Sequence, residues 1–181
     1  MAAMREIKSL GARVLSIVNV VGSTIAREAD DVIYTWAGPE IAVATTKAYS
    51  TQLAVVSQLA IYMADQRGTI TPEYYAALVA ELERLPDKAA QVLEEQSEIQ
   101  HFASRFFNHN SIFFIGRNLD YATGMEGSLK LKEISYIHSE AYASGELKHG
   151  TISLIEPGTL VIALGTYAPL FEGDEQRRRG Q

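Results

Sequence analysis

The sequence predicts an α/β protein in which two short parallel-sheet units are joined by a helical segment. Two observations support this fold class. Short β-branched or apolar runs alternate with helical patterns near both ends of the chain, whereas the stretch between them, from about 45 to 110, stays helical by pattern. Alternation of strands and helices is typical of a parallel sheet, because the crossover to a parallel neighbour needs a connection long enough to hold a helix.

The first 68 residues predict two strands separated by a short helix, followed by a long helix. The strands are expected at 13–18 and 32–35, after a helix that stops at Leu10-Gly11. Ser23 is the expected N-cap of the short helix, because its hydroxyl can accept a bond from a free backbone N–H. Thr45 and Thr46 are expected to cap the long helix, which runs to Arg67-Gly68.

The remaining residues predict more helices and then a second sheet unit. A helix restarts at Thr71-Pro72, and Pro86 divides the helical stretch in two. Beyond Ser111 we expect a strand at 112–116, a helix at 121–137 and an apolar strand at 159–164. Two or three strands are too few for either unit to bury both faces of a sheet alone, so the sequence predicts parts of two domains.

Composition and charge exclude several classes of protein. With 47% hydrophobic and 21% charged residues the chain resembles an average globular protein. A net charge of −6 argues against nucleic acid as a partner, and the basic cluster 177–179 is interpreted as a solvated tail. The absence of cysteine excludes disulfides, thiolate metal sites and a cysteine nucleophile.

The sequence also predicts neither a signal peptide nor a membrane span. The most apolar stretch, 48–64, carries serine, threonine and glutamine, which suits a helix buried in protein better than one facing lipid. We therefore expect a cytoplasmic protein without a membrane partner.

Three charged residues carry the most chemical information. Glu126, Lys130 and Glu133 are spaced to share one face of a helix. The simpler interpretation is a surface salt-bridge ladder, worth a few tenths of a kcal/mol per pair. The alternative is aldose–ketose isomerisation, which needs a carboxylate base beside the reacting carbon and a cation for the developing oxyanion. Spacing alone favours the ladder.

The histidines and glycine turns leave alternatives open. His101, His109 and His138 lie in or beside helical pattern and are expected to be structural or exposed, whereas His149 lies in a glycine-bracketed turn, where functional groups concentrate. A histidine could open a sugar ring by proton transfer near neutral pH. The turns at 20–24 and 114–118 follow strands and could hold a ligand. A plain turn is the favoured interpretation of the first.

Four sequence blocks together resemble one enzyme family. EGSLKLKEISYIH (126–138) and EAYASGELKHG (140–150) resemble the second sugar-isomerase (SIS) lobe of the glucosamine-6-phosphate synthase family. AGPEIAVATTKAYSTQ (37–52), preceded by NVVGSTIAREAD (19–30), resembles the end of the first lobe. The resemblance extends from about Arg5 to Phe171. Another phosphosugar isomerase of the SIS type would leave the pairing of these blocks unexplained.

The resemblance implies a fold, a reaction and a set of site residues. Each lobe would be flavodoxin-like, with a parallel sheet and helices on both faces. The family converts fructose 6-phosphate and glutamine to glucosamine 6-phosphate and glutamate. By resemblance, Glu133 would be the enediol base, Lys130 the neighbouring cation and His149 the ring-opening residue supplied by the adjacent subunit, while the backbone of Val43 and Ala44 would line the sugar site. A homodimer with a sugar-phosphate ligand is expected, without cofactor or metal.

Departures from the family pattern suggest an internal piece of such an enzyme. We expect residues 1–68 to form the C-terminal part of the first lobe, 69–109 a helical connector, 110–172 the N-terminal part of the second lobe and 173–181 a non-matching tail. The family's phosphate loop, glutaminase domain and imine-forming lysine are not in this sequence. We therefore expect the chain to be inactive alone. The alternative is a non-catalytic module that binds sugar phosphate or dimerises.

Overall fold

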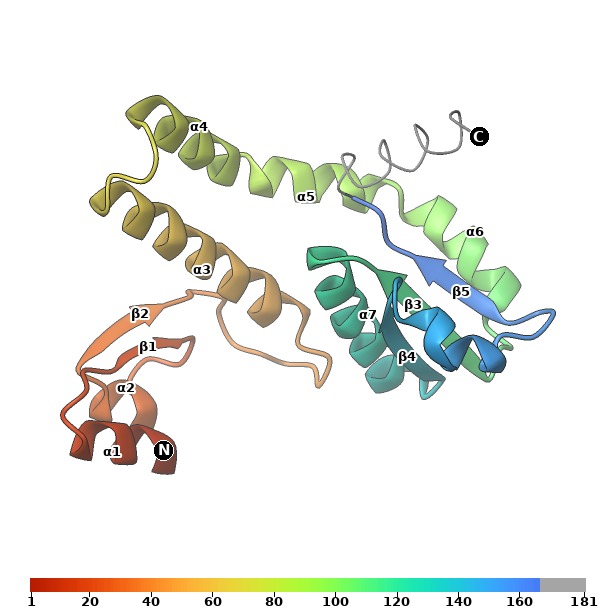
Figure 1. Cartoon of the computed structure of the whole chain (residues 1–181), viewed down its shortest axis with the longest axis horizontal. Coiled ribbons are helices and arrows are strands. Elements are labelled where there is room, and N and C mark those ends of the chain that lie inside the picture. The colour runs from red at the N-terminus through yellow and green to blue at the C-terminus, as the bar shows by residue number, and fades with distance from the viewer. Residues whose placement is uncertain (167–181) are drawn as a thin grey trace. The chain divides into compact units, whose positions relative to one another are not determined.

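The computed structural model describes residues 1–166, which form two compact α/β units that divide between Glu95 and Gln96 (Figure 1). Both sheets are parallel, as the sequence predicts. The expected end of the second lobe at 167–172, the non-matching tail at 173–181 and the basic cluster within that tail lie outside the described residues. The lobe and connector boundaries stay predictions.

The first unit is a two-stranded sheet followed by long helices. Its elements are α1 (Ala2–Ser9), β1 (Leu15–Val18), α2 (Thr24–Glu28), β2 (Asp31–Tyr34), α3 (Thr46–Gln66), α4 (Pro72–Glu83) and α5 (Leu85–Glu94). Strands β1 and β2 pair in register from Leu15 opposite Asp31 to Val18 opposite Tyr34. The short helix α2 makes the crossover between them, which is the strand–helix–strand order that the sequence predicts.

The starts of the helices in this unit agree with the capping residues expected from the sequence, with one exception. The hydroxyl of Ser23 accepts a bond from the Ala26 N–H at 3.3 Å, as expected for the N-cap of α2. A proline near the start of α5 separates that helix from α4, as predicted. The helical stretch divides a second time at Glu95, before the next helix begins, and the expectation of two helices is wrong in this respect. Thr45 is the N-cap residue of α3, but its hydroxyl donates to the Val43 carbonyl at 3.0 Å. The expected side-chain cap of α3 is therefore absent at Thr45.

Ion pairs attach α1 and the start of β1 to the segment around β2. Arg5 contacts Glu28 with two bonds of 2.8 and 2.6 Å, and Lys8 lies 2.8 Å from Asp30. Arg13 likewise donates two hydrogen bonds to the carboxylate of Asp31, of 2.6 and 2.9 Å. Hydrogen bonds from these cations hold the pKa of each of the three carboxyls below its ordinary value. Charge pairing therefore contributes to the cohesion of the first unit.

The second unit contains a three-stranded sheet in the order β4-β3-β5. Its elements are α6 (Gln96–Phe106), β3 (Ser111–Gly116), α7 (Leu119–Ser135), β4 (His138–Ala143), the 3₁₀ helices η1 (Leu147–His149) and η2 (Thr151–Leu154), and β5 (Leu160–Ala163). The first strand lies in the middle, with the second and third on either side of it. This order matches the beginning of the flavodoxin-like order 2-1-3-4-5.

Strand β4 is the element that the sequence analysis missed. Its sequence, HSEAYA, lacks a run of large apolar residues. His138, expected in or beside helical pattern, begins this strand three residues after α7 ends, and its side chain is exposed as expected. The helix ends at Ser135, because Tyr136 adopts the left-handed conformation with a φ of 61°. Pairing with β3 along its whole length, from Ser111 opposite His138 to Gly116 opposite Ala143, stabilises this polar strand.

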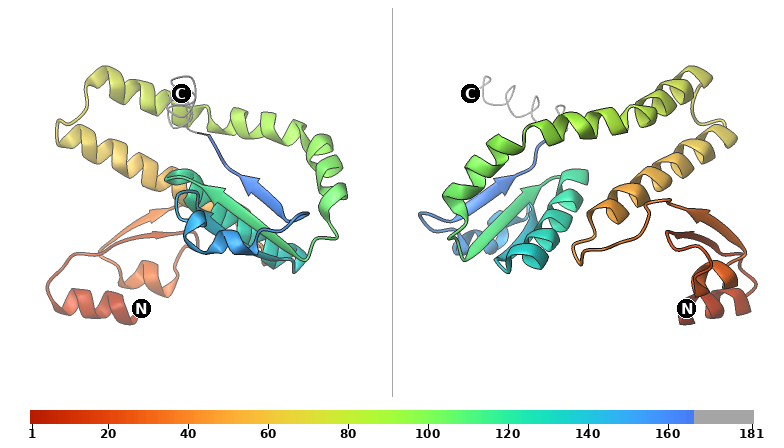
Figure 2. Two further views of the ribbon diagram at one scale, coloured as in Figure 1. Left: turned by 45° about the vertical axis from the view of Figure 1, so that its right-hand side comes forward. Right: turned by 180° about the vertical axis from the view of Figure 1, so that it is seen from behind.

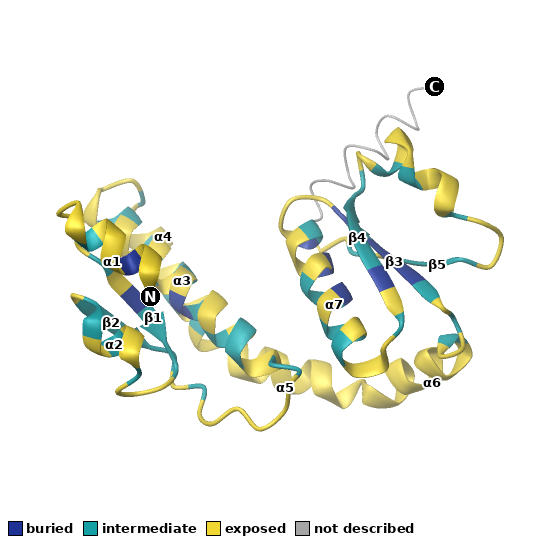
Figure 3. Ribbon diagram, turned by 90° about the horizontal axis from the view of Figure 1, so that it is seen from below, coloured by how far each residue is buried: buried dark blue, intermediate teal, exposed yellow. Residues whose placement is uncertain are grey.

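Alternate residues of the sheet face opposite sides. Phe114 faces α7, where a Cβ on Gly124 or Gly127 would lie 3.5 or 3.2 Å from its side-chain atoms. Figure 2 shows α7 along β3 and β4, and Figure 3 shows the most buried residues of the unit on β3 and on one side of α7. Phe113, one residue earlier, contacts Tyr142 and Glu140 on the other face. Helix α7 therefore covers one face of this sheet only.

Candidate functional site

Helix α7 brings together the three charged residues predicted to share a face. The ammonium of Lys130 lies 2.6 Å from Glu133 Oε2 and 3.5 Å from Glu126 Oε1. The side chains of Glu126, Lys130 and Glu133 are 22%, 17% and 25% exposed. A freely solvated salt-bridge ladder would be more exposed than this. The arrangement is a partly buried cation held between two carboxylates.

Close packing of α7 on the sheet fixes where these charges lie. The glycines at 124 and 127 allow the helix to approach Phe114, and Ser128 meets Ser139 of β4. The Ser139 hydroxyl donates to the Ser128 carbonyl at 2.9 Å, and the two hydroxyls lie 2.9 Å apart. Both serines are buried, at 3% and 0% exposure. This contact links α7 to β4 two residues before Lys130.

The electrostatics of the cluster keep Lys130 charged. The hydrogen bond that the Lys130 ammonium donates to Glu133 raises the pKa of Lys130, partial desolvation opposes that shift, and the charges of Glu133 and Glu126 add to it. The Glu133 carboxylate, next to this protonated ammonium, can accept a proton from a substrate carbon. The ammonium can stabilise an adjacent oxyanion.

His149 is not bonded to this cluster within the described residues. It ends η1, is exposed, and precedes Gly150, whose φ of 136° requires glycine. Within residues 1–166 no hydrogen bond or ion pair joins its imidazole to Glu133 or Lys130. The resemblance assigns His149 to the site of an adjacent subunit, and its role stays a prediction.

Val43 and Ala44 belong to the first unit, in the loop before α3. The Val43 carbonyl accepts the Thr45 hydroxyl, and the Ala44 carbonyl accepts the Thr46 N–H at 3.0 Å. Neither N–H of this pair donates to an acceptor within the described part of the chain. These backbone donors are available to a ligand, and the assignment to a sugar site stays a prediction.

The two glycine turns have structural explanations. In the first, the Ser23 hydroxyl is already used as a cap and Arg27 donates to the Gly22 carbonyl. In the second, a Cβ on Gly116 would lie 2.5 Å from the Asp120 carbonyl carbon. Asp120 itself is buried and accepts bonds from the N–H and hydroxyl of Thr166. The position of this turn at the end of a strand is the reason to expect a ligand there. Its glycine is explained by the close packing of β3 against the backbone of Asp120.

Two further features bear on the type of site. Within residues 1–166 no group of three or more His, Asp or Glu side chains is placed to hold a metal ion. No helix among those residues combines the length and apolarity needed to cross a membrane.

Comparison with protein families matches residues 1–62 and 105–169 to the SIS domain. The chain belongs to the SIS family. The two matched stretches cover most of both units, and the resemblance to SIS lobes seen in the sequence is confirmed.

Two relatives of this SIS chain are glutamine–fructose-6-phosphate aminotransferases (isomerizing). The chain is 58% identical to the protein of Clostridium tetani over 172 residues, which is 95% of this chain and 28% of the relative. It is 56% identical to the protein of Symbiobacterium thermophilum over 185 aligned positions, covering 99% of this chain and 30% of that relative. The SIS chain thus spans less than a third of the length of these relatives.

Solved structures agree with the SIS fold. The C-terminal domain of glucosamine-fructose-6-phosphate aminotransferase from Francisella tularensis superposes with a TM-score of 0.86 at 37% identity, covering 89% of this chain and 45% of that one. Glucosamine-6-phosphate deaminase from Thermotoga maritima superposes with a TM-score of 0.65 at 22% identity, covering 98% and 51%. The second match shows the fold alone.

Proposed function

We propose that this chain carries the proton-transfer machinery of a glutamine–fructose-6-phosphate aminotransferase, the enzyme that makes glucosamine 6-phosphate. The observation that supports this most strongly is the partly buried pair of Lys130 and Glu133, 2.6 Å apart, in a chain 56–58% identical to enzymes of that name. The chain corresponds to part of their sugar-isomerising region.

The proposed chemistry is conversion of a ketose to an aldose. The Glu133 carboxylate removes a proton from C1 of the open-chain sugar, and electrons shift toward the oxygen or nitrogen on C2. The Lys130 ammonium stabilises the negative charge that develops in the resulting enediolate-type intermediate. The C1 hydroxyl proton then passes to the oxygen or nitrogen on C2. Return of the carbon-bound proton from Glu133 to C2 forms the C1 aldehyde and regenerates the carboxylate.

Other parts of the site come from outside the α7 cluster. His149 of an adjacent subunit opens the sugar ring, and the backbone at Val43 and Ala44 lines the sugar. The assignment of His149 requires a homodimer, and the ligand is fructose 6-phosphate or glucosamine 6-phosphate. The phosphate loop, the ammonia supply and the imine-forming lysine of the family are not in this sequence. Phosphate contacts supply positioning energy for such chemistry, so the chain alone is expected not to turn over fructose 6-phosphate.

A chimera tests the proposal without depending on the activity of the short chain. The matching region of the Symbiobacterium thermophilum relative would be replaced by this sequence, and glucosamine 6-phosphate formation would be measured. We expect an active chimera that loses about 10²–10⁴-fold in kcat on Glu133→Gln, the range for loss of a general base. Glu126→Gln, which alters the more distant carboxylate of the cluster, is the matched control and is expected to retain more activity.

Two results would contradict the proposal. A folded chimera in which Glu133→Gln is as active as its parent would remove Glu133 from the mechanism. Turnover of fructose 6-phosphate by the isolated chain would show that the missing segments are dispensable.

A non-catalytic module is the second candidate. The observation in its favour is the set of large apolar side chains exposed on the helices, including Val56 at 52%, Met63 at 57% and Leu93 at 75%. Such surfaces are typical of protein interfaces. Size-exclusion chromatography of the isolated chain separates the candidates, because a stable dimer supports a module and aggregation supports a piece of a larger enzyme.

A further inference from the structure

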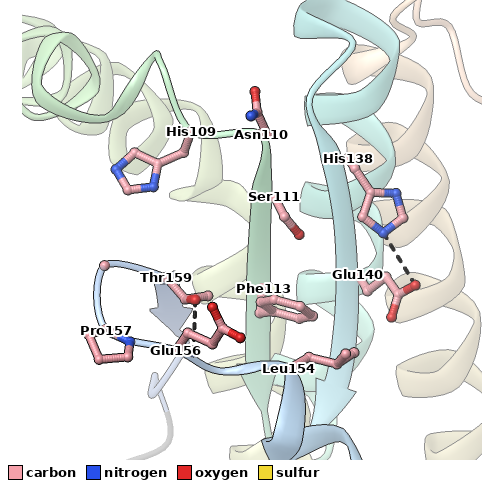
Figure 4. A pocket seen from close by; sticks show the side chains of 11 residues that line it. His109, Asn110, Ser111, Phe113, His138, Glu140, Leu154, Glu156, Pro157 and Thr159 are labelled. Atoms are coloured by element: carbon pink, nitrogen blue, oxygen red, sulfur yellow. Dashed lines mark hydrogen bonds and ion pairs between the residues drawn. The ribbon is translucent and has the colours of Figure 1, made fainter.

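The sheet face opposite α7 carries a groove that the proposed reaction does not use. Its volume is about 490 Å³, within the range typical of small-molecule sites. Strand β4 forms one wall and the segment 154–159, which leads into β5, forms the other. The turn from α6 into β3 closes one end (Figure 4). We call this space, lined by residues of 109–113, 138–140 and 154–159, the amino-edge groove.

The amino-edge groove is separate from the α7 cluster. Ser139 of β4 points to α7, where it bonds Ser128, so its neighbours His138 and Glu140 lie on the opposite face. Phe113 pairs with Glu140 across the strands and lies on this face as well. The sheet therefore stands between the groove and the pair of Lys130 and Glu133.

The charge of the groove restricts what it can bind. Glu140 and Glu156 contribute carboxylates, and neither lysine nor arginine is among the described residues that line it. A phosphate or carboxylate ligand would meet two negative charges without a lysine or arginine to offset them. A single metal ion fits poorly as well, since the described residues contain no metal-binding group of three or more His, Asp or Glu side chains.

The polar groups of the groove are arranged around an apolar floor. In Figure 4 the Phe113 ring lies between the carboxylates of Glu140 and Glu156. Tyr142 donates a hydrogen bond to Glu140, and the imidazole of His138 lies 3.4 Å from the same carboxylate. Glu140 is thus held in place before any ligand arrives. The Glu156 N–H is bonded to the Thr159 hydroxyl, which orders the facing wall.

Together these features describe a ligand with three properties. It has a positive charge for the carboxylates and hydroxyl groups for the carboxylate and imidazole acceptors. It also has an apolar C–H face for the side chains of Leu154 and Pro157 beside the edge of Phe113. We propose that the amino-edge groove is a second ligand site, distinct from the α7 cluster, for a small cationic polyol of the amino-sugar class without phosphate.

Titration of the full chain with glucosamine tests this, with backbone amide shifts followed by NMR. We expect saturable shifts centred on the amides of Phe113 and Gly158. Glucose, which lacks the charge, is expected to bind about fivefold more weakly, because an ion pair in a partly exposed groove contributes up to about 1 kcal/mol. Glucosamine 6-phosphate, which adds an anion, is expected to bind more weakly than glucosamine.

Charge-removing variants locate the site. Glu156→Gln changes an exposed residue, leaves the fold intact and is expected to weaken glucosamine binding about fivefold, by the same ion-pair estimate. Glu94→Gln, an exposed carboxylate on α5 that does not line the groove, is the matched control and is expected to leave the affinity unchanged. Equal affinity for glucose and glucosamine would overturn the proposal. So would shifts that map to α7, an unchanged affinity in Glu156→Gln, or the absence of saturable binding.

Discussion

At the scale of single residues, the buried hydroxyl of Ser139 supports the candidate site. It is fully buried and donates to the carbonyl of Ser128, a residue that belongs to α7. Its neighbours on the same face of β4 include Ala141, so small side chains let the helix approach the strand closely. The position of the charged face of α7 therefore depends on a buried polar contact as well as on the packing of the helix against Phe114.

Ser139→Ala tests that dependence. The change leaves the Ser128 hydroxyl and carbonyl buried without this partner, and an unsatisfied buried polar group costs about 1–3 kcal/mol. We expect a loss of that size in the free energy of unfolding, measured by urea denaturation. Ser135→Ala is the control, because its hydroxyl donates to the Leu131 carbonyl at an exposed site. Equal losses in the two variants would show that burial of the serine pair contributes nothing.

At the scale of elements, prediction from sequence succeeded where a local pattern dictated structure. The strands at β1, β2, β3 and β5 are β-branched or apolar runs, and prolines mark the starts of α4 and α5. The polar strand β4 was missed because its stability comes from pairing with β3 and from packing under α7, which no local pattern reveals. Helical spacing likewise predicted that Glu126, Lys130 and Glu133 share a face. It could not predict their partial burial, which depends on how closely α7 docks.

At the junction of β3 and α7 the backbone packs so closely that only glycine fits at position 116. A Cβ at Gly116 would lie 2.5 Å from the Asp120 carbonyl carbon and 2.6 Å from the Tyr121 nitrogen, both backbone atoms. Gly116→Ala is therefore expected to destabilise the fold by about 1–3 kcal/mol, the usual cost of overpacking. At Gly145 a Cβ has open space, so Gly145→Ala serves as the control in the same denaturation experiment. A Gly116→Ala protein as stable as that control would contradict the close approach.

At the scale of the whole molecule, the two units differ in what stabilises them. In the second unit, Ile112, Phe113 and Phe114 of β3 form a continuous buried run. In the first unit, the buried apolar side chains are Met4 and Val55, and three ion pairs attach α1 and β1 to the α2–β2 segment. The first unit is therefore expected to respond more strongly to pH and salt than the second.

Acid should weaken the first unit before the second. The folded-state pKa values of Glu28, Asp30 and Asp31 are lowered, mainly by hydrogen bonds from Arg5, Lys8 and Arg13 respectively. A lowered pKa means that the folded state binds protons less readily than the unfolded chain. The stabilisation is therefore complete above the unfolded values near pH 4 and is lost as the pH falls through the folded ones.

Amide hydrogen exchange, compared between pH 6 and the acid range below about pH 4, measures this difference for each unit. Protection at Ile17 of β1 is expected to fall at a higher pH than protection at Phe114 of β3. Arg13→Gln removes the cation beside Asp31. The first unit of this variant is therefore expected to be less stable at neutral pH and to lose less stability on acidification than the parent. High salt should reduce the same contribution by screening these exposed pairs. Two results together would contradict this prediction: loss of protection at the same pH in β1 and β3, and the same pH dependence in Arg13→Gln as in the parent. Charge pairing would then not explain a difference in acid stability between the units.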